Sequence, residues 1–306
     1  PAKYDFLLQN PRTKMVTYNS WEAIQNFRKA KYWIVNFYVQ AAIVKMPRQV
    51  MLQCWHGTPY KRIGLDIQAI RKGAFLPLEK VSFTYNLDAK KHDYFISPSG
   101  FATEKFVSAF NLKDLGKEDI VLEKGYPRND FLFNHTNDDV EQTKQKLHIP
   151  LDKKVILYAP TWRDDQHASA GGYIFNPTFD FGKFVEFLGD SHVILYRTHY
   201  LVNSLSELSR YEGFVIDVSD VDDINDIYIV SDILITDYSS VFFDFANLKR
   251  PIIFYMYDYE NYKNNLRDFY LTLDDLPGPV VRDEDALLDA IKDLQHTSAS
   301  RRRKLD

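Results

Sequence analysis

The stretch Ser231–Leu248, SDILITDYSSVFFDFANL, decides the fold class of this chain of 306 residues. It opens with an apolar run, Ile233–Thr236, which predicts a buried strand, and it closes with Ser240–Leu248, which predicts a helix. Another apolar run, Ile252–Tyr255, follows directly. A strand, a helix and a second strand in succession are typical of the βαβ unit, so this stretch predicts a parallel sheet.

The same alternation extends outward over almost the whole chain. The predicted strands are Tyr32–Val35, Val50–Trp55, Tyr94–Ser97, Ile120–Glu123, Val155–Ala159, His192–Tyr196, Phe214–Asp217, Ile233–Thr236 and Ile252–Tyr255. The predicted helices are Ser20–Lys29, Thr103–Phe110, Asp138–Leu147, Ile224–Val230, Ser240–Leu248 and Asp283–Leu294. Most of the strands are apolar throughout, as expected for strands that helices cover on both faces. The sequence therefore predicts an α/β protein.

A domain boundary is predicted near the middle of the chain. The segment Asn134–Asp139 is polar, and Pro150 precedes a new strand at Val155. We expect two α/β domains, residues 1–148 and 149–306, with a ligand-binding cleft between them. The chain begins at Pro1 without Met and stops after the basic run Arg301–Lys304, so we expect a fragment of a longer protein.

The composition excludes several classes of protein. With 45% hydrophobic and 26% charged residues the chain can bury a core, and a net charge of -4 provides no overall basic field for nucleic acid. The single cysteine, Cys54, excludes an internal disulfide and fits a reducing cytoplasm. No apolar run approaches the roughly 20 residues that cross a bilayer.

The first candidate site is Gln53–Pro59, QCWHGTP, at the end of a predicted strand. Strand alternation would place Cys54 and His56 on one face, with His56 at the carboxyl end where ligands approach. Histidine is suited to accept a proton at neutral pH. Gly57 permits close approach of a substrate to the backbone, and Thr58 adds a hydroxyl. The alternative is a structural histidine.

Two further motifs also close predicted strands. In YAPTWR, Arg163 and Thr161 are candidates to bind phosphate or carboxylate oxygens. In YRTHY, Arg197 beside His199 suits a diphosphate, with the imidazole as a proton or hydrogen-bond donor. A turn or a surface loop with solvated side chains is the alternative in both places.

The segment between the strand and the helix of the opening stretch is the fourth candidate. Ser239 and Ser240 stand at the predicted helix start, where unpaired N–H groups and the helix dipole favour a phosphate. Asp244 is placed to accept hydrogen bonds from ribose hydroxyls, and Asp237 is a further candidate contact to the nucleotide. Plain helix capping by serine is the alternative.

Some familiar site patterns do not occur in the sequence. There is no G-x-x-x-x-G-K-[ST] and no G-x-G-x-x-G, which disfavours ATPase and nicotinamide chemistry. Carboxylate pairs occur at Asp164-Asp165, Asp222-Asp223 and Asp274-Asp275. Each pair favours a loop or a helix start over a Mg²⁺ site. We therefore predict no metal site and no required cofactor, with Mg²⁺ as the alternative.

Several motifs together resemble the CDP-glycerol glycerophosphotransferase family, which primes and polymerises teichoic acids and related polymers. They are CWHGTPYKRIGLD (Cys54–Asp66), SPSGFATEKF (Ser97–Phe106), GYPRNDFL (Gly125–Leu132), YAPTWR (Tyr158–Arg163) and TDYSSVFFDF (Thr236–Phe245). The match covers nearly the whole chain from about Lys31. The resemblance implies a GT-B-type fold, with two Rossmann-like domains whose parallel sheets face a central cleft.

The resemblance also implies domain roles and site residues. The first domain would be the acceptor side, incomplete at its start, and the second would bind the nucleotide donor and lack a closing helix. The family's two important histidines fall on His56 and His199. Its nucleotide contacts fall on Arg163, on Ser239-Ser240 and on Asp244.

The reaction implied is phosphoryl transfer. A terminal hydroxyl of an acceptor polymer would attack the β-phosphorus of CDP-glycerol or CDP-ribitol and displace CMP. A lipid-linked acceptor would place the protein peripherally at the inner face of the membrane. The basic clusters Lys29–Lys31, Lys90-Lys91 and Arg301–Lys304 would then attract anionic lipid.

Two other function classes stay open. A GT-B nucleotide-sugar glycosyltransferase would share the fold and transfer a hexose, because function depends on the site and not on the fold. A non-catalytic polymer-binding module would bind polymer without consuming any CDP-alditol.

Overall fold

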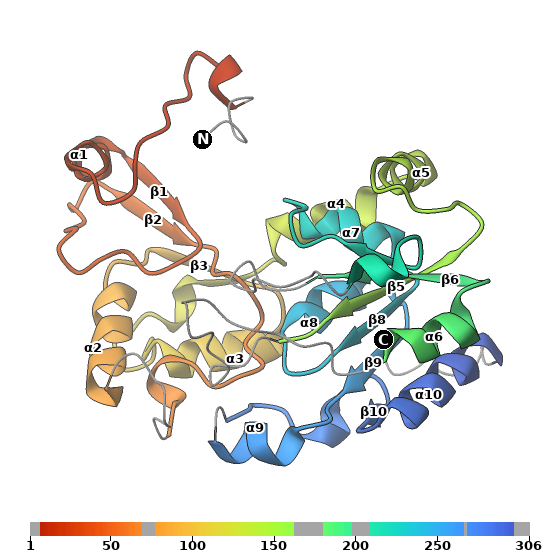
Figure 1. Cartoon of the computed structure of the whole chain (residues 1–306). Coiled ribbons are helices and arrows are strands. Elements are labelled where there is room, and N and C mark those ends of the chain that lie inside the picture. Colours follow the sequence, from red (N-terminus) through yellow and green to blue (C-terminus); the bar gives the residue numbers. More distant parts are fainter. Residues whose placement is uncertain (1–6, 69–76, 162–179, 198–207, 266–267, 297–306) are drawn as a thin grey trace, which may run out of the picture. The chain divides into compact units, whose positions relative to one another are not determined.

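The computed structural model describes residues 7–68, 77–161, 180–197, 208–265 and 268–296 (Figure 1). These residues form two compact units. Unit 1 contains the described residues up to His56 together with Glu79–Gly125, and unit 2 contains the rest. Each unit is built on its own parallel sheet.

The sheet of unit 1 has four parallel strands. They are β1 (Tyr32–Val35), β2 (Val50–Gln53), β3 (Tyr94–Ser97) and β4 (Val121–Glu123), hydrogen-bonded in that order. Helix α1 (Trp21–Lys29) precedes β1, α2 (Leu78–Ala89) lies between β2 and β3 in the chain, and α3 (Gly100–Ala109) lies between β3 and β4. Val35 pairs with Gln53, so β1 and β2 end side by side. The segments that follow these two strands therefore start next to each other.

Aromatic side chains fill the core of unit 1. Phe95, Phe106 and Phe110 are almost completely buried, and the rings of Phe95 and Phe106 lie 4.7 Å apart. The buried ring of Trp55 meets Phe110 edge-on at 5.0 Å. Each fully buried large apolar side chain contributes roughly 1.5–3 kcal/mol. This cluster therefore fixes the segment directly after β2.

The sheet of unit 2 has six parallel strands. They are β5 (Lys154–Ala159), β6 (His192–Tyr196), β7 (Val215–Asp217), β8 (Ile233–Thr236), β9 (Ile252–Tyr255) and β10 (Val280–Val281), arranged as β10-β9-β8-β5-β6-β7. Strands β6 and β7 lie on one side of β5, and β8, β9 and β10 lie on the other. This doubly wound order reverses between β5 and β8, and ligands of such sheets bind beyond the strand ends at that point.

Side chains of the central strands alternate between two cores. On β5, Val155 and Leu157 belong to one core and Ile156 and Tyr158 to the other. The accompanying helices are α4 (Asp130–Asn134), α5 (Asn137–Lys146), α6 (Phe181–Leu188), α7 (Ile224–Val230), α8 (Val241–Phe245), α9 (Tyr259–Asn265) and α10 (Glu284–His296) (Figure 1). Burial on both faces explains why these strands are apolar throughout.

All nine predicted strands are confirmed, most within one residue of their expected ends. The expectation was wrong at Val50–Trp55, because β2 ends at Gln53. It also missed β10 and the helices α2, α4, α6 and α9. The helix expected over Ser240–Leu248 is a five-residue α-helix that continues as a 3-10 turn and ends at the left-handed Lys249.

The division into units differs from the boundary expected between residues 148 and 149. Helices α4 and α5 pack against α7 and so belong to unit 2. Tyr60 lies in a core cluster of unit 2, so the segment after His56 belongs there as well. Within the described residues, no helix has both the length and the apolar character needed to cross a membrane.

Candidate active site

A buried carboxylate, that of Asp237, links the ends of β5 and β8 at the point where the strand order of the unit 2 sheet reverses. Oδ1 of Asp237, after β8, accepts hydrogen bonds from the backbone N–H of Thr161 at 2.8 Å and from that of Tyr238 at 2.6 Å. The hydroxyl of Thr236 donates to the carbonyl of Ala159 at 2.8 Å. Two of the predicted site residues, Thr161 and Asp237, are thus joined. Asp237 fixes the ends of β5 and β8 relative to each other.

The Gly-Thr pair of the HGTP motif packs against the start of α8. A Cβ atom on Gly57 would lie 3.3 Å from Oγ of Ser240 and 4.0 Å from Nη2 of Arg128. Thr58 is buried beside it. A side chain at position 57 would therefore crowd the Ser240 hydroxyl, so glycine allows a close approach there. The neighbour in this structure is Ser240, another predicted site residue.

An ion pair fixes Arg128 next to this serine. Nη2 of Arg128 lies 3.0 Å and 2.9 Å from the two carboxylate oxygens of Asp244, and Nδ2 of Asn129 donates to Asp244 at 2.8 Å. The carbonyl of Arg128 accepts from Asn225 at 2.7 Å, and its guanidinium lies 4.3 Å from the ring centre of Tyr126. Asp244, expected to bind ribose, has both oxygens engaged in orienting Arg128.

Sequence reasoning did not single out Arg128. It could have been recognised from the sequence, because it lies in the GYPRNDFL motif that supported the family resemblance. Its side chain is one third exposed, and its Nη2 is paired with Asp244. Arginine in this setting is suited to bind phosphate oxygens.

At Ser239 and Ser240 the groups suited to bind a phosphate are the hydroxyls and not the helix dipole. Oγ of Ser239 accepts from the N–H of Val241 at 3.4 Å, whereas the Ser240 side chain makes no capping hydrogen bond. A helix of five residues sums few peptide dipoles, so the macrodipole expected at this point is small. The candidate phosphate donors are the Ser240 hydroxyl and nearby backbone amides.

Arg197 has a structural partner that the sequence did not indicate. Its Nη1 donates to the carbonyls of Val218 and Val221 at 2.8 Å and 2.9 Å. Burial lowers the pKa of its guanidinium. Arg197 thus anchors the segment after β7. Arg163 and His199 lie outside the described residues, as does the pair Asp164-Asp165.

His56 belongs to unit 1 and is exposed. Its Nδ1 lies 2.9 Å from the carbonyl oxygen of Asn36. A carbonyl only accepts, so Nδ1 carries the proton and Nε2 is the proton acceptor of the neutral ring. The strand alternation assumed for Cys54 and His56 does not extend to them, because β2 ends at Gln53 and Trp55 is left-handed with a φ of 51°. Burial raises the pKa of the Cys54 thiol, which disfavours a thiolate nucleophile.

Two of the carboxylate pairs cap helices. Asp223 accepts from the N–H of Asn225 at the start of α7, and Asp275 forms a capping box with Thr272. Over the parts of the chain that the structure describes, no cluster of three His, Cys, Asp or Glu side chains is arranged to hold a metal ion.

Comparisons with known proteins cover both units. Residues 3–306 match the family model described as CDP-Glycerol:Poly(glycerophosphate) glycerophosphotransferase. A teichoic acid glycerol-phosphate transferase of Staphylococcus aureus is 43% identical over 96% of this chain and 75% of its own length. A teichoic acid poly(glycerol phosphate) polymerase of Bacillus subtilis is 43% identical over 87% of this chain, which spans 35% of that protein.

A solved structure agrees with these matches. The wall teichoic acid polymerase TagF superposes with a TM-score of 0.86 at 40% identity, over 96% of this chain and 71% of TagF. A variant of TagF soaked with CDPG also gives a TM-score of 0.86. The chain therefore belongs to the CDP-glycerol:poly(glycerophosphate) glycerophosphotransferase family, whose members are transferases.

Proposed function

We propose that this chain transfers glycerol phosphate from CDP-glycerol to the terminal hydroxyl of a teichoic-acid-type polymer. The bond between the acceptor oxygen and the β-phosphorus forms as the bond from that phosphorus to the CMP oxygen breaks. CMP leaves, and the hydroxyl proton passes to a base. Family membership carries the proposal, and the relatives named above are glycerol-phosphate enzymes, which favours glycerol over ribitol in the donor.

The two units would form a GT-B-type pair of Rossmann-like domains that face a cleft. Support comes from the likeness to TagF, which extends over 96% of this chain. The doubly wound order of the unit 2 sheet supports a nucleotide site beyond β5 and β8. Unit 1 would then serve the acceptor.

The donor diphosphate would be bound beyond β5 and β8. Thr58, Ser239 and Ser240 supply hydroxyls there. Arg128 supplies a cation that Asp244 orients, so its geometry exists before the donor binds. Pre-oriented donors stabilise the charge of a phosphoryl-transfer transition state more than mobile ones do. Arg163 and His199 join this set on the family resemblance.

His56 would be the general base. Its Nδ1–H donates to Asn36, which directs the basic Nε2 to accept a proton. A base with a pKa near the working pH suits this step, and the ordinary value for histidine is about 6.5.

A donor panel tests the function. Purified protein with a glycerol-phosphate acceptor is incubated with CDP-glycerol, CDP-ribitol or a UDP-sugar, and released nucleotide is measured. We expect CMP from CDP-glycerol to exceed CMP from CDP-ribitol, and no UDP. Release of UDP alone would support a glycosyltransferase. Polymer binding with no nucleotide released from any donor would support a binding module.

We also propose peripheral contact with the inner membrane face through exposed lysines. The expected cluster Lys90-Lys91 cannot act as a pair, because Lys91 is buried and its Nζ donates to the carbonyls of Val39 and Gln40. Lys29 and Lys31, near the end of α1, stay available. Co-sedimentation with anionic vesicles at low but not high salt is expected, and equal pelleting with neutral vesicles would contradict this proposal.

A further inference from the structure

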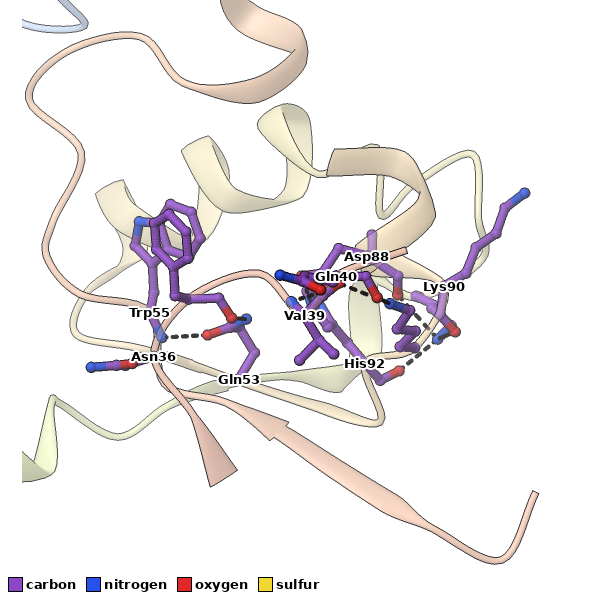
Figure 2. A network of polar contacts seen from close by, with 12 residues as sticks. Asn36, Val39, Gln40, Gln53, Trp55, Asp88, Lys90 and His92 are labelled. Carbon is purple, nitrogen blue, oxygen red and sulfur yellow. Dashed lines mark hydrogen bonds and ion pairs between the residues drawn. The ribbon is translucent and has the colours of Figure 1, made fainter. Parts of the chain in front are cut away.

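The side chain of Gln53, at the end of β2, bridges two backbone segments. It is completely buried. Its Nε2 donates to the carbonyl of Phe37 at 3.1 Å, and its Oε1 accepts from the N–H of Trp55 at 2.9 Å (Figure 2). A carbonyl only accepts and a peptide N–H only donates, so the orientation of the amide is unambiguous. Phe37 follows Asn36 in the chain and Trp55 precedes His56, so Gln53 joins the two segments that carry the Asn36–His56 hydrogen bond.

The far side of the same segment is also fixed. The N–H of Val39 donates to Oδ1 of Asp88 at 2.9 Å, and Nζ of Lys91 donates to the carbonyl of Val39 at 2.9 Å (Figure 2). Oδ2 of Asp88 pairs with Nε2 of the buried His92 at 3.0 Å. The segment after β1 is therefore held from α2 on one side and from Gln53 on the other.

We propose that Gln53 is a positioning residue that sets the tautomer of His56. By holding Phe37 and Trp55 together it keeps the Asn36 carbonyl at Nδ1, so that the proton stays on Nδ1 and Nε2 is left basic. Loss of the Gln53 bridge lets the two segments separate, and the ring then also adopts the form protonated at Nε2, which cannot accept a proton there. The consequence for turnover rests on the proposed function, whereas the tautomer does not.

Gln49 provides a matched control in the same unit. It is also buried, and it fixes the other end of the segment between β1 and β2. Its Nε2 donates to the carbonyl of Phe27 at 2.7 Å, and its Oε1 accepts from the N–H of Met46 at 2.8 Å. Gln49→Met and Gln53→Met therefore remove the same kind of bridge, but only the second bridge adjoins Asn36 and His56.

The test is the ¹⁵N spectrum of the full chain labelled at histidine, recorded at a pH where the rings are neutral. Comparison with His56→Gln identifies the His56 signals. We expect Nδ1 protonated in the wild type and in Gln49→Met, and a substantial fraction protonated at Nε2 in Gln53→Met. If Gln53→Met does not fold, Gln53→Glu keeps the acceptor for Trp55, removes the donor to Phe37, and should show the same change in smaller degree.

Three outcomes would overturn the inference. They are a wild-type His56 protonated at Nε2, an unchanged tautomer in folded Gln53→Met or Gln53→Glu, and an equal change in Gln49→Met. Turnover is a second, independent measurement. In Gln53→Met we expect kcat for CMP release to fall about tenfold and KM for the donor to stay unchanged. A wild type that releases no CMP would refute the proposed function and leave the tautomer result standing.

Discussion

In unit 1 the carbonyl of Asn36, directly after β1, lies 2.9 Å from Nδ1 of His56 in the segment after β2. In unit 2, beyond β5 and β8, the guanidinium of Arg128 and the hydroxyl of Ser240 lie near Gly57. The first environment leaves a nitrogen able to accept a proton, and the second offers donors suited to a phosphate. The difference indicates that proton transfer and donor binding can be changed separately by substitution.

Removal of the His56 ring should have the largest effect. In His56→Ala we expect kcat for CMP release to fall at least about a hundredfold, because a general base is lost, while CDP affinity stays near the wild-type value. Kinetics at saturating donor and calorimetry with CDP measure the two quantities. His135→Ala is the control, because Nδ1 of His135 also lies 3.0 Å from a carbonyl, that of Leu132. Wild-type turnover in His56→Ala would show that His56 is not the general base.

Substitution of Arg128 should lower CDP affinity, the quantity that His56→Ala leaves near the wild-type value. In Arg128→Gln we expect CDP affinity to fall about tenfold to a hundredfold, the range for loss of a hydrogen bond to a charged group. Unfolding temperature should also fall, because Asp244 loses its cation. Arg282→Gln is the control, since Arg282 also lies over a tyrosine ring but is exposed. An unchanged CDP affinity would place the phosphates elsewhere.

Crowding at Gly57 should have a smaller effect. Because a Cβ there lies 3.3 Å from Oγ of Ser240, Gly57→Ala should weaken CDP binding several-fold by displacing that hydroxyl. In a Ser240→Ala background the same change should cost nothing further. Gly100→Ala is the control, because its Cβ would meet Glu123 at an ordinary 3.8 Å. Additive losses in the double variant would show that Gly57 and Ser240 act independently.

The smallest effect concerns His192, a buried histidine at the start of β6. Burial lowers its pKa, so the unfolded chain binds a proton more readily than the folded one. Its stabilising contribution is therefore complete above the unfolded pKa of about 6.5 and is lost as the pH falls below that value, by at most about 1.4 kcal/mol per pH unit.

Denaturant unfolding between pH 5 and 7.5 measures this contribution. His192→Asn should reduce the loss of stability toward low pH, whereas the same substitution at the exposed His148 should not. Equal pH profiles for the wild type and His192→Asn would show that this ring is not a source of acid sensitivity.

The strands were predictable from sequence because burial on both faces makes them continuously apolar. Helix α2 was not, since Val81, Phe83 and Tyr85 alternate as in a strand and only the surrounding fold makes the segment helical. The ion pair of Arg128 with Asp244 joins residues 116 positions apart, a distance at which spacing carries no information. The sequence predicted Gly57, Thr58, Thr161, Asp237 and Ser240 as site residues, but not the contacts between them.

The left-handed backbone of Trp55 leads us to expect that the surroundings of His56 open as one unit. That backbone conformation costs roughly 1–2 kcal/mol for a residue other than glycine, the same order as the gain from burying a large ring. Trp55 therefore contributes little net free energy while its ring stays against Phe110. If the ring leaves Phe110, we expect the backbone to relax to an extended form, so that a partial departure of the ring is not favoured. Amide exchange at residues 53–56 should accordingly report one cooperative opening and not a series of small ones.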